Sequence, residues 1–523
     1  MQSRLVLWSI VAALAGFLFG FDTVVISGAE KSIQALWDLS PAMHGIVMGS
    51  ALYGTVAGAI AGAWPTDRWG RKKTLLWIGI LYLVSAIWSG LATDPWSFSI
   101  ARFIGGLGVG VSTVAAPLYI SEISPPDRRG RLAGMFQFNI VFGILVAFLT
   151  NWLLSNVGDN SWRWMMGSEA LPALIYSLAC FSLPESPRWL MSRGRDAEAT
   201  VILKAISPTK SDAEIGQIAQ AIRSTPHEKD ARRPSLWSVD LRRPVVLAFL
   251  IAFFNQLSGI NAILYFAPRI FGLTGSENAL GQSIGIGITN LIFTFAGLWL
   301  IDRLGRRTLL YIGSFGYILS LGLCAVAFFT WAPQFRAASA AVDVKAAVDG
   351  LAKANPARVA KLEEDLEKKK EALVAATAEP KSGAEPVTFS SEASPDAVKA
   401  TANDALVLSS KAAGAGGMMV LVCIFAFIAA HAIGQGAVIW VFISEIFPDR
   451  CRAAGQSLGS ATHWVFAAAL TTVFPLMMAK LAPGTVFLFF TGMMVLQLIW
   501  VKLMVPETKG VPLEEMQQKL SIR

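Results

Sequence analysis

Three charged residues stand deep inside otherwise apolar stretches of this 523-residue chain: Asp22, Arg102 and Glu169. Asp22 lies about 10 Å before the end of its stretch, and the other two lie about 8 Å after the start of theirs. A carboxylate beside a guanidinium stays ionised, whereas loss of that partner lets burial favour the protonated form. Charges at such depth would be costly in a membrane and indicate a functional site there, so the set predicts a proton-coupling device. The alternatives are a structural ion pair and, for Glu169, an end residue hydrated from outside.

The composition indicates a membrane protein. Hydrophobic residues make up 54% of the chain and charged residues only 15%, whereas about a quarter of the residues in a soluble domain are charged. This leaves too few polar side chains to cover a soluble protein of such length, which excludes an ordinary soluble enzyme. The four cysteines have no metal-ligand spacing, so the sequence predicts no metal site. The net charge of +8 does not indicate a nucleic-acid partner, because the basic residues gather in short loops between apolar runs.

Twelve apolar runs are long enough to cross a bilayer as helices, since about 20 residues span its ~30 Å of hydrocarbon. The runs are 5–29, 45–64, 74–92, 97–120, 132–154, 164–183, 244–271, 280–301, 308–332, 415–443, 453–479 and 484–502. Lys and Arg gather after runs 2, 4, 8 and 10, and the connections after runs 3 and 7 carry none. By the positive-inside rule, we expect both termini in the cytoplasm.

The runs and the two long connections predict the domain organisation. A first six-helix bundle over 1–184 is joined by a cytoplasmic helical linker, 185–243, to a second bundle over 244–523. An exterior insertion, 333–414, interrupts the second bundle. Its richness in Ala, Lys and Glu predicts a solvated helix near 361–374 with disordered flanks.

Three motifs recur six spans apart. GAWPTDRWGRKK (62–73) matches GLWLIDRLGRRT (297–308), SEISPPDRRG (121–130) matches SEIFPDRCRA (444–453), and PESPRWL (184–190) matches PETKGVP (506–512). Such a duplication predicts two six-helix bundles related by an axis along the membrane normal, with a central cavity between them.

The repeated loops pair acids with arginines at helix ends. Charge-assisted hydrogen bonds between such groups favour one conformation, so we predict a conformational latch. Its residues are Asp67, Arg71, Glu122 and Arg129 in the first half, and Asp302, Arg306, Glu445 and Arg452 in the second. The alternative is that the basic residues serve only membrane topology, which leaves the acids without a role.

These segments resemble the sugar porter branch of the major facilitator superfamily. The paired D-R-x-G-R loops are typical of the superfamily, and PESPRWL, N-Q-L-S-G-I-N at 255–261 and PETKG are typical of the sugar branch. The resemblance covers the chain except for about 333–414. It implies an all-α membrane protein of twelve transmembrane helices in two six-helix bundles. It also implies a bacterial cytoplasmic membrane, no cofactor, and a monomer that works with a monosaccharide, a proton and the lipid bilayer.

The resemblance also implies an activity. In the family's proton symporters, the Asp of G-F-D-T-V-V-I-S-G (20–28) pairs with the Arg of R-F-I-G-G (102–106), whereas facilitative relatives lack the acid. The expected function is therefore proton-coupled symport of a hexose or pentose by alternating access, with the latch closing the cytoplasmic side of the outward-facing state. A facilitative uniporter of the same fold and a non-transporting sugar receptor are the alternatives.

A sugar site needs amide side chains for the hydroxyl groups and an aromatic plate for the C–H face. The resemblance implies sugar contacts from Gln137, Gln256, Asn261, Tyr265, Asn290 and Trp440, with Phe19 facing the cavity. Two positions depart from the family: Asn255 precedes Gln256 where paired glutamines are usual, and His463 replaces the amide before Trp464. His463 adds a titratable group, so we expect altered sugar preference and pH response, unless it is a neutral packing histidine.

Overall fold

The computed structural model describes residues 3–125, 129–158, 160–208, 210–224, 236–352, 359–390, 393–511 and 513–520. Every regular element within these ranges is a helix, which confirms the all-α prediction. The first half contains α1 (Ser3–Leu36), α2 (Pro41–Ala61), α3 (Ala63–Trp69), α4 (Arg71–Leu91), α5 (Pro95–Ile123), α6 (Arg129–Leu154), α7 (Ser161–Gly167) and α8 (Ala170–Cys180). The second half contains α12 (Arg242–Leu257), α13 (Ile260–Tyr265), α14 (Ala267–Gly272), α15 (Ala279–Leu304), α16 (Arg306–Thr330), α20 (Gly416–Ile433), α21 (Gln435–Ile446), α22 (Asp449–Lys480) and α23 (Pro483–Met504).

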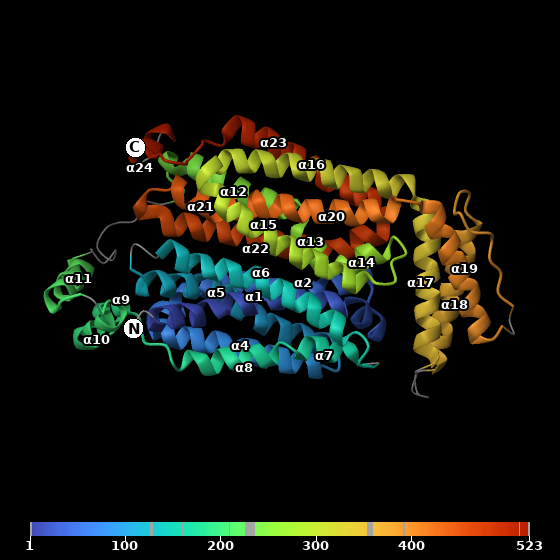
Figure 1. Cartoon of the computed structure of the whole chain (residues 1–523), viewed down its shortest axis with the longest axis horizontal. Coiled ribbons are helices and arrows are strands. Elements are labelled where there is room, and N and C mark those ends of the chain that lie inside the picture. Colours follow the sequence, from blue (N-terminus) through green and yellow to red (C-terminus); the bar gives the residue numbers. More distant parts are fainter. Residues whose placement is uncertain are drawn as a thin grey trace.

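The remaining helices lie at the two ends of the molecule. Between the halves come α9 (Pro187–Ser192), α10 (Asp196–Ile206), α11 (Asp212–Ser224) and the short η1 (Val239–Leu241), and α24 (Leu513–Lys519) follows the second half. The insertion forms α17 (Ala332–Ala352), α18 (Val359–Ala378) and α19 (Pro395–Ala413). Both chain termini lie near α10 and α24 at one end of the long axis, and α17–α19 lie at the other (Figure 1). We call these the terminal end and the distal end.

Eleven of the described helical segments are long and apolar enough to cross a membrane. The sixth predicted span is absent from this set because Ser168 and Glu169 divide it into α7 and α8, which are too short singly. The seventh span is broken between α12 and α13 at Gly259, where φ is +87°. Glycine suits this left-handed conformation, and the ring of Phe490 occupies the space that a side chain at this position would need. The tenth span is also divided, into α20 and α21 at Gly434, so the twelve predicted spans are accounted for, three of them by broken helices.

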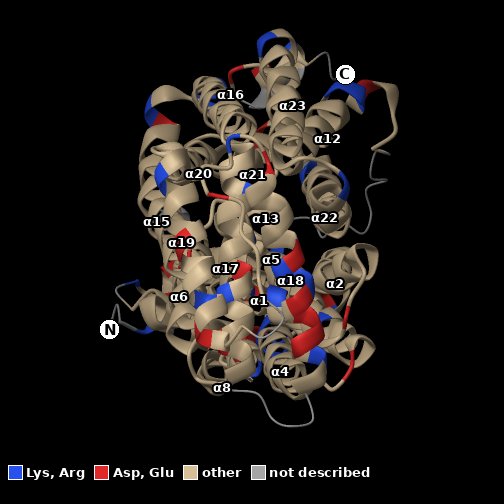
Figure 2. Ribbon diagram, turned by 90° about the vertical axis from the view of Figure 1, so that its right-hand side faces the viewer, with Lys and Arg blue, Asp and Glu red and all other residues tan. Residues whose placement is uncertain are grey.

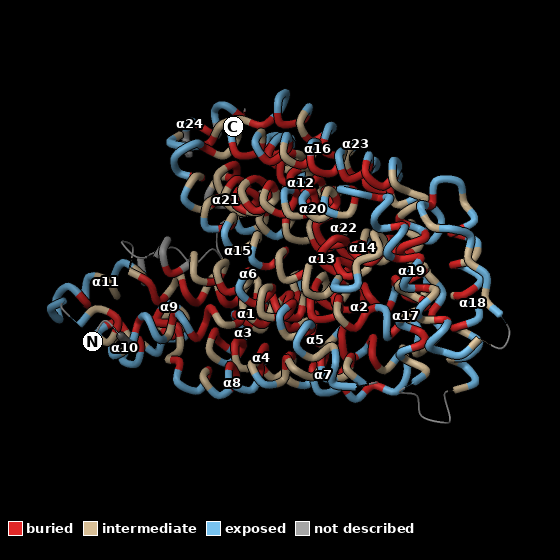
Figure 3. The backbone as a smooth tube through the Cα atoms, turned by 45° about the vertical axis from the view of Figure 1, so that its right-hand side comes forward, coloured by how far each residue is buried: buried red, intermediate tan, exposed pale blue. Residues whose placement is uncertain are grey.

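The two halves pack together through α2 against α22 and through α6 against α15. The helices approach closely near the distal end, where a Cβ atom added to Gly45 would lie 1.8 Å from the carbonyl oxygen of Thr472. Farther along α2, the Tyr53 hydroxyl lies 2.5 Å from Oγ1 of Thr472. The halves diverge toward the terminal end (Figure 3). The interface is therefore tightest at the distal end.

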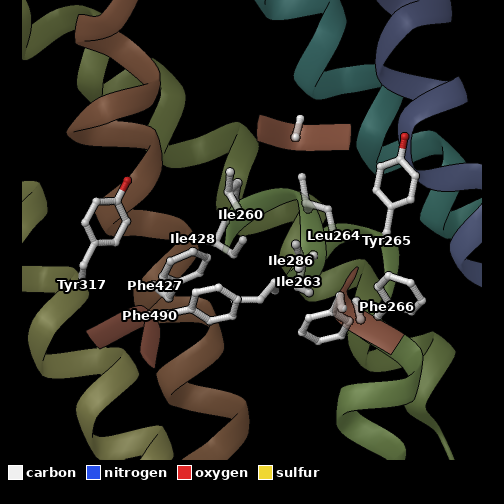
Figure 4. Close-up of a cluster of buried hydrophobic side chains, with 14 of the residues drawn as sticks. Ile260, Ile263, Leu264, Tyr265, Phe266, Ile286, Tyr317, Phe427, Ile428 and Phe490 are labelled. Carbon is white, nitrogen blue, oxygen red and sulfur yellow. The ribbon is translucent and has the colours of Figure 1, made fainter. Parts of the chain in front are cut away.

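The buried core continues across the interface. One cluster of apolar side chains includes Val24 of α1 together with Ile263 of α13 and Phe427 of α20. Part of this cluster lies around α13 (Figure 4). Large apolar side chains such as Leu178, Leu319 and Leu503 are exposed, as expected of helices that face lipid.

The expectation of a lone solvated helix with disordered flanks in the insertion was wrong. Its flanks form the helices α17 and α19, which pack with α18 around a core of their own that includes Val344, Leu373 and Val398. The physical reason is that the Ala-rich flanks carry apolar residues at helical spacing, so three helices can bury one face each. The ammonium of Lys345 lies 2.6 Å from the Glu277 carboxylate in the α14–α15 connection, which fastens the unit to the second half.

The insertion lies across the distal end of both halves. Viewed from that end, α18 lies in front of helices of the first half, and its charged residues are visible (Figure 2). Asp38, between α1 and α2, interacts electrostatically with Lys368 of α18. A cavity of about 610 Å³ separates α17 and α18 from the ends of α16 and α23, with Phe328, Phe329, Arg336 and Glu379 in its walls.

Candidate substrate and proton sites

Asp22 on α1 and Arg102 on α5 form a buried ion pair. Each residue is 1% exposed. The Arg102 guanidinium donates a hydrogen bond to the Asp22 carboxylate and a second, 3.0 Å long, to the Asp22 carbonyl oxygen. Glu169, in the break between α7 and α8, is equally buried and interacts electrostatically with both residues. The structure thus brings the three charged residues together, and Glu169 is not an end residue hydrated from outside.

The start of α5 sets the depth of Arg102. The Asp94 side chain accepts hydrogen bonds from the backbone N–H groups of Trp96 and Ser97 at 3.0 and 2.9 Å, and Pro95 occupies the first helical position. This capping fixes where the helix begins, about two turns before Arg102. A buried charge that loses its partner destabilises a protein by about 3–5 kcal/mol, so Asp22 and Arg102 depend on each other.

Gln256 on α12 is the centre of a buried amide cluster. Its Oε1 accepts a 2.7 Å hydrogen bond from Asn261, and its Nε2 donates to Asn255 Oδ1 at 2.9 Å. The same Nε2 lies 3.1 Å from Nε2 of His463 on α22. The Trp440 ring of α21 follows, with its centroid 5.3 Å from that of His463. The break at Gly259 separates α12 from α13, yet the hydrogen bond between Gln256 and Asn261 bridges it.

Two predicted residues connect this cluster to the first half. Phe19 of α1 faces Trp464 of α22, with ring centroids 5.5 Å apart. Tyr265, the last residue of α13, is buried at the edge of an apolar cluster, and its hydroxyl points toward the helices of the first half (Figure 4). It interacts electrostatically with Arg102 and Asp22. The amide cluster and the ion pair therefore meet at the interface between the halves.

Gln137 and Asn290 stand outside this network. Among the described side chains, the hydrogen-bond partners of Gln256 are Asn255, Asn261 and His463. Asn290 instead accepts a 3.4 Å hydrogen bond from Thr294 on its own helix. Gln137 and Asn290 are both half-buried. They lie on α6 and α15, the second pair of helices through which the halves contact each other.

The predicted latch residues form matching networks at the terminal end. In the first half, the Arg71 guanidinium donates two 2.9 Å hydrogen bonds to Glu122 and one of 3.2 Å to Asp67. In the second, Arg306 donates to Glu445 at 2.7 and 3.0 Å and to Asp302 at 3.4 Å. Both networks bind helix ends within one half.

Arg129 and Arg452 are the two other predicted latch residues. The Arg129 side chain lies outside the described residues. Arg452 lies half-buried near the start of α22.

Sequence reasoning missed two glutamates of the same networks. Glu185 accepts hydrogen bonds from the backbone N–H groups of Arg71 and Lys72 at 2.9 and 3.2 Å. Glu507 accepts from Arg306 and Arg307 at 2.9 and 3.0 Å. Burial raises the pKa of Glu185 above its usual value of 4.5, against the opposing effect of these N–H donors. The sequence did contain a signal that could have found them, because each glutamate is the second residue of a repeated motif, P-E-S for Glu185 and P-E-T for Glu507.

A further buried carboxylate also went unpredicted. Glu30 is 1% exposed on α1, although the first apolar run ends at residue 29. The helix continues to Leu36, so Glu30 lies inside it and not at its end. Glu30 is therefore a further buried charged residue within a helix, one residue beyond the predicted apolar run.

Comparison with known proteins places the chain in a family. The model of the family described as "Sugar (and other) transporter" matches residues 8–344 and 398–520. The chain belongs to this family of sugar porters. Residues 345–397, which the match leaves out, form most of the insertion. The family is one of transporters and not of enzymes.

Individual relatives cover the chain almost completely. The arabinose-proton symporter of Bacillus subtilis (strain 168) is 29% identical over 98% of this chain and 94% of the relative. The D-xylose-proton symporter of Escherichia coli (strain K12) is 28% identical over 97% of this chain and 94% of the relative. A partially occluded inward-open structure of the E. coli xylose transporter XylE covers 98% of this chain and 100% of its own, with a TM-score of 0.73 and 27% identity. The sugar porter fold of the major facilitator superfamily is thus confirmed.

Proposed function

We propose that this sugar porter moves a monosaccharide, a hexose or a pentose, into the cell together with a proton. The proposal rests mainly on the buried Asp22–Arg102 pair. This pair interacts electrostatically with Tyr265, which lies on the same helix as Asn261 of the amide cluster. The names of the two relatives, an arabinose-proton and a D-xylose-proton symporter, support the same activity. The coupling ion is the proton, and the mechanism uses no cofactor.

The coupling step follows from the ion pair. The Arg102 guanidinium donates a hydrogen bond to the Asp22 carboxylate, and an opposite charge this close favours the charged form of a carboxyl group. A proton that binds Asp22 removes the charge that holds the guanidinium, and Glu169 is a second carboxylate within reach of the same proton. Arg102 then moves relative to Tyr265, which lies on α13 with Asn261. Binding of the proton on α1 and binding of the sugar on α12 and α13 thereby affect each other.

The amide cluster supplies the chemistry for a sugar. Gln256, Asn261 and His463 offer donors and acceptors that now satisfy one another and that sugar hydroxyl groups can replace. Trp440 supplies a flat apolar face for the sugar ring. We assign Phe19, Gln137, Tyr265 and Asn290 to the walls around this cluster, since they lie on the facing helices of the interface.

The terminal end is the cytoplasmic side in this proposal, so that the distal end faces the exterior. The basic loops at the terminal end support this orientation. The chain functions as a monomer in the bacterial cytoplasmic membrane, and its two halves, 1–184 and 244–523, rock about the site between them. Closure at the distal end corresponds to an inward-facing state. TM-scores of 0.73 and 0.72 with two inward-open XylE structures support this assignment.

The latch keeps each half rigid and controls closure of the cytoplasmic side. Bidentate pairs such as Arg71 with Glu122 and Arg306 with Glu445 hold the helix ends of each half together. Asp67, Arg129, Asp302 and Arg452 complete the two sets. In the outward-facing state the two sets approach each other, and they separate when the site opens inward.

Uptake into proteoliposomes tests the proposal. Purified protein is reconstituted, and uptake of radiolabelled xylose, arabinose and glucose is measured with and without an imposed inward proton gradient. We expect accumulation of one of these sugars above its external concentration only with the gradient. Equal uptake under both conditions would show a uniporter, and the absence of uptake and of sugar binding would exclude a sugar transporter.

A further inference from the structure

A cluster of polar side chains lies at the distal end, away from the amide cluster and the Asp22 pair. Glu30 on α1 and His44 on α2 are 1% and 0% exposed. Nε2 of His44 lies 2.6 Å from Oε1 of Glu30, and Nε of Arg269 donates to the same oxygen at 2.7 Å. A second nitrogen of Arg269 donates to the side-chain oxygen of Gln34. We call Glu30, Gln34, His44 and Arg269 the distal cluster.

The distal cluster crosses the interface between the halves. Glu30 and Gln34 lie on α1 and His44 on α2, all in the first half, whereas Arg269 lies on α14 in the second. Lys31 reaches the same element, since its ammonium lies 3.1 Å from the position that a Cβ atom on Gly272 would take. Unlike the networks of Arg71 and Arg306, this ion pair joins one half to the other.

Apolar packing covers Glu30 and His44, whereas the Arg269 side chain is 27% exposed. The His44 ring lies against Phe266, with centroids 6.1 Å apart, and Phe266 lies against Phe474 of α22 at 4.9 Å. A charge-assisted hydrogen bond to a carboxylate that is buried in this way is stronger than one between two surface groups. The pair of Glu30 and Arg269 therefore contributes to the closure of the distal end.

Opening of the distal end must separate Glu30 from Arg269 but not from His44. Arg269 moves away with the second half, while His44 stays beside Glu30 in the first. Glu30 thus loses the guanidinium and keeps the imidazole, so the buried carboxylate is never left without a hydrogen-bond partner. The ion pair stabilises only the closed arrangement. In the open arrangement, the hydrogen bond from His44 reduces the free-energy cost of burying the Glu30 carboxylate.

We propose that Glu30 and Arg269 form an ionic lock that holds the distal end of this transporter closed, and that His44 positions the Glu30 carboxylate when the lock is open. The proposal rests on the alternating-access function given above. It assigns Glu30 to conformational control and leaves proton coupling to Asp22. Glu30 and Arg269 are positioning residues that need not touch the sugar.

The lock is tested by the accessibility of the distal interface. Thr472→Cys places a reporter where Gly45 and Tyr53 cover α22, in a background in which the four buried native cysteines are replaced by serine. Right-side-out membrane vesicles are treated with a membrane-impermeant maleimide, and the labelling rate is measured. Glu30→Gln and Arg269→Gln are each expected to raise this rate about tenfold or more, the loss that corresponds to one charge-assisted hydrogen bond.

Two further comparisons separate the lock from a general loss of structure. The double variant should label no faster than either single variant, and Arg269→Lys should restore slow labelling. The matched control is Glu277→Gln, which breaks the ion pair with Lys345 without touching the interface and should leave the rate unchanged. The lock would be overturned if Glu30→Gln and Arg269→Gln were labelled at the same rate as the unaltered protein. It would also be overturned if the double variant raised the labelling rate by the product of the two single effects. The readout requires no proton gradient, so failure of symport and failure of the lock are distinguishable.

Discussion

Glu185 and Glu507 occupy the same place in the two halves of this sugar porter. Each accepts hydrogen bonds from two successive backbone N–H groups at the start of a helix, α4 for Glu185 and α16 for Glu507. The first of these N–H groups belongs in each case to the arginine that binds the acid of its own half, Arg71 or Arg306. Helix N-termini favour negative charge, so one carboxylate satisfies free donors and steadies the arginine network in both halves.

Replacement of Glu185 should change how stability depends on pH. Burial raises the pKa of Glu185 above 4.5, so its folded form binds the proton more tightly than the unfolded chain does. Its contribution to the free energy of unfolding is then largest below about pH 4.5 and is lost as the pH rises through the folded pKa. We expect the Tm of the unaltered protein minus that of Glu185→Gln to fall as the pH is raised from 4.5 to 7, measured by thermal unfolding in nanodiscs.

The control for this experiment is Glu198→Gln. Glu198 is exposed and pairs with Arg195 on the surface of the linker, so its replacement should give a difference in Tm that is small at every pH. A difference that grows with pH for Glu185→Gln would contradict the assignment.

Asp22→Asn should uncouple sugar movement from the proton gradient. The amide keeps the shape and a hydrogen bond to Arg102 but cannot release a proton, so gradient-driven accumulation should be abolished while sugar counterflow continues. Asp94→Asn is the matched control, since asparagine caps a helix as well as aspartate does and α5 should start unchanged. Accumulation that survives in Asp22→Asn would show that the proton binds elsewhere.

Gln256→Ala should weaken sugar binding about tenfold to a hundredfold. The substitution removes the group that links Asn255, Asn261 and His463 and leaves buried polar atoms unpaired, at a cost of about 1–3 kcal/mol. Binding is measured by tryptophan fluorescence or a ligand-dependent shift in Tm. Gln497→Ala removes another fully buried amide, which donates to Ser314 within the second half, and should leave the Kd unchanged. Equal effects of both substitutions would indicate a general loss of packing.

Deletion of 340–410, with a short Gly–Ser linker, should leave transport intact. The insertion packs around its own core, and the shortened chain keeps the first turns of α17, where Ala338 lies against Gly275. We expect sugar uptake within about twofold of the full-length rate, since surface insertions of this kind cost little beyond loop closure. Leu373→Asp, which places a charge in the insertion core, checks the same point without shortening the chain. A deletion variant that inserts correctly and does not transport would assign a necessary role to α17–α19.

The sequence by itself predicted the membrane spans and their order. Hydrophobic runs of bilayer length mark each span, because lipid requires the backbone to satisfy its hydrogen bonds within helices. The cost of a charge in lipid made Asp22, Arg102 and Glu169 visible without any structure. The repeated motifs revealed the duplication, and with it the positions of Arg71 and Arg306.

Only the tertiary structure decided which side chains meet. Glu30 and His44 lie 14 residues apart and Arg269 more than 200 residues beyond them, so no local spacing in the sequence joins them. For the same reason, the three helices of the insertion could not be predicted from its sequence alone. An Ala-rich segment becomes a packed helix only where other helices cover its apolar face, as α17, α18 and α19 do for one another. Apolar periodicity and the cost of buried charge act along the chain and can be read from it, whereas contacts between helices depend on how two whole bundles are docked.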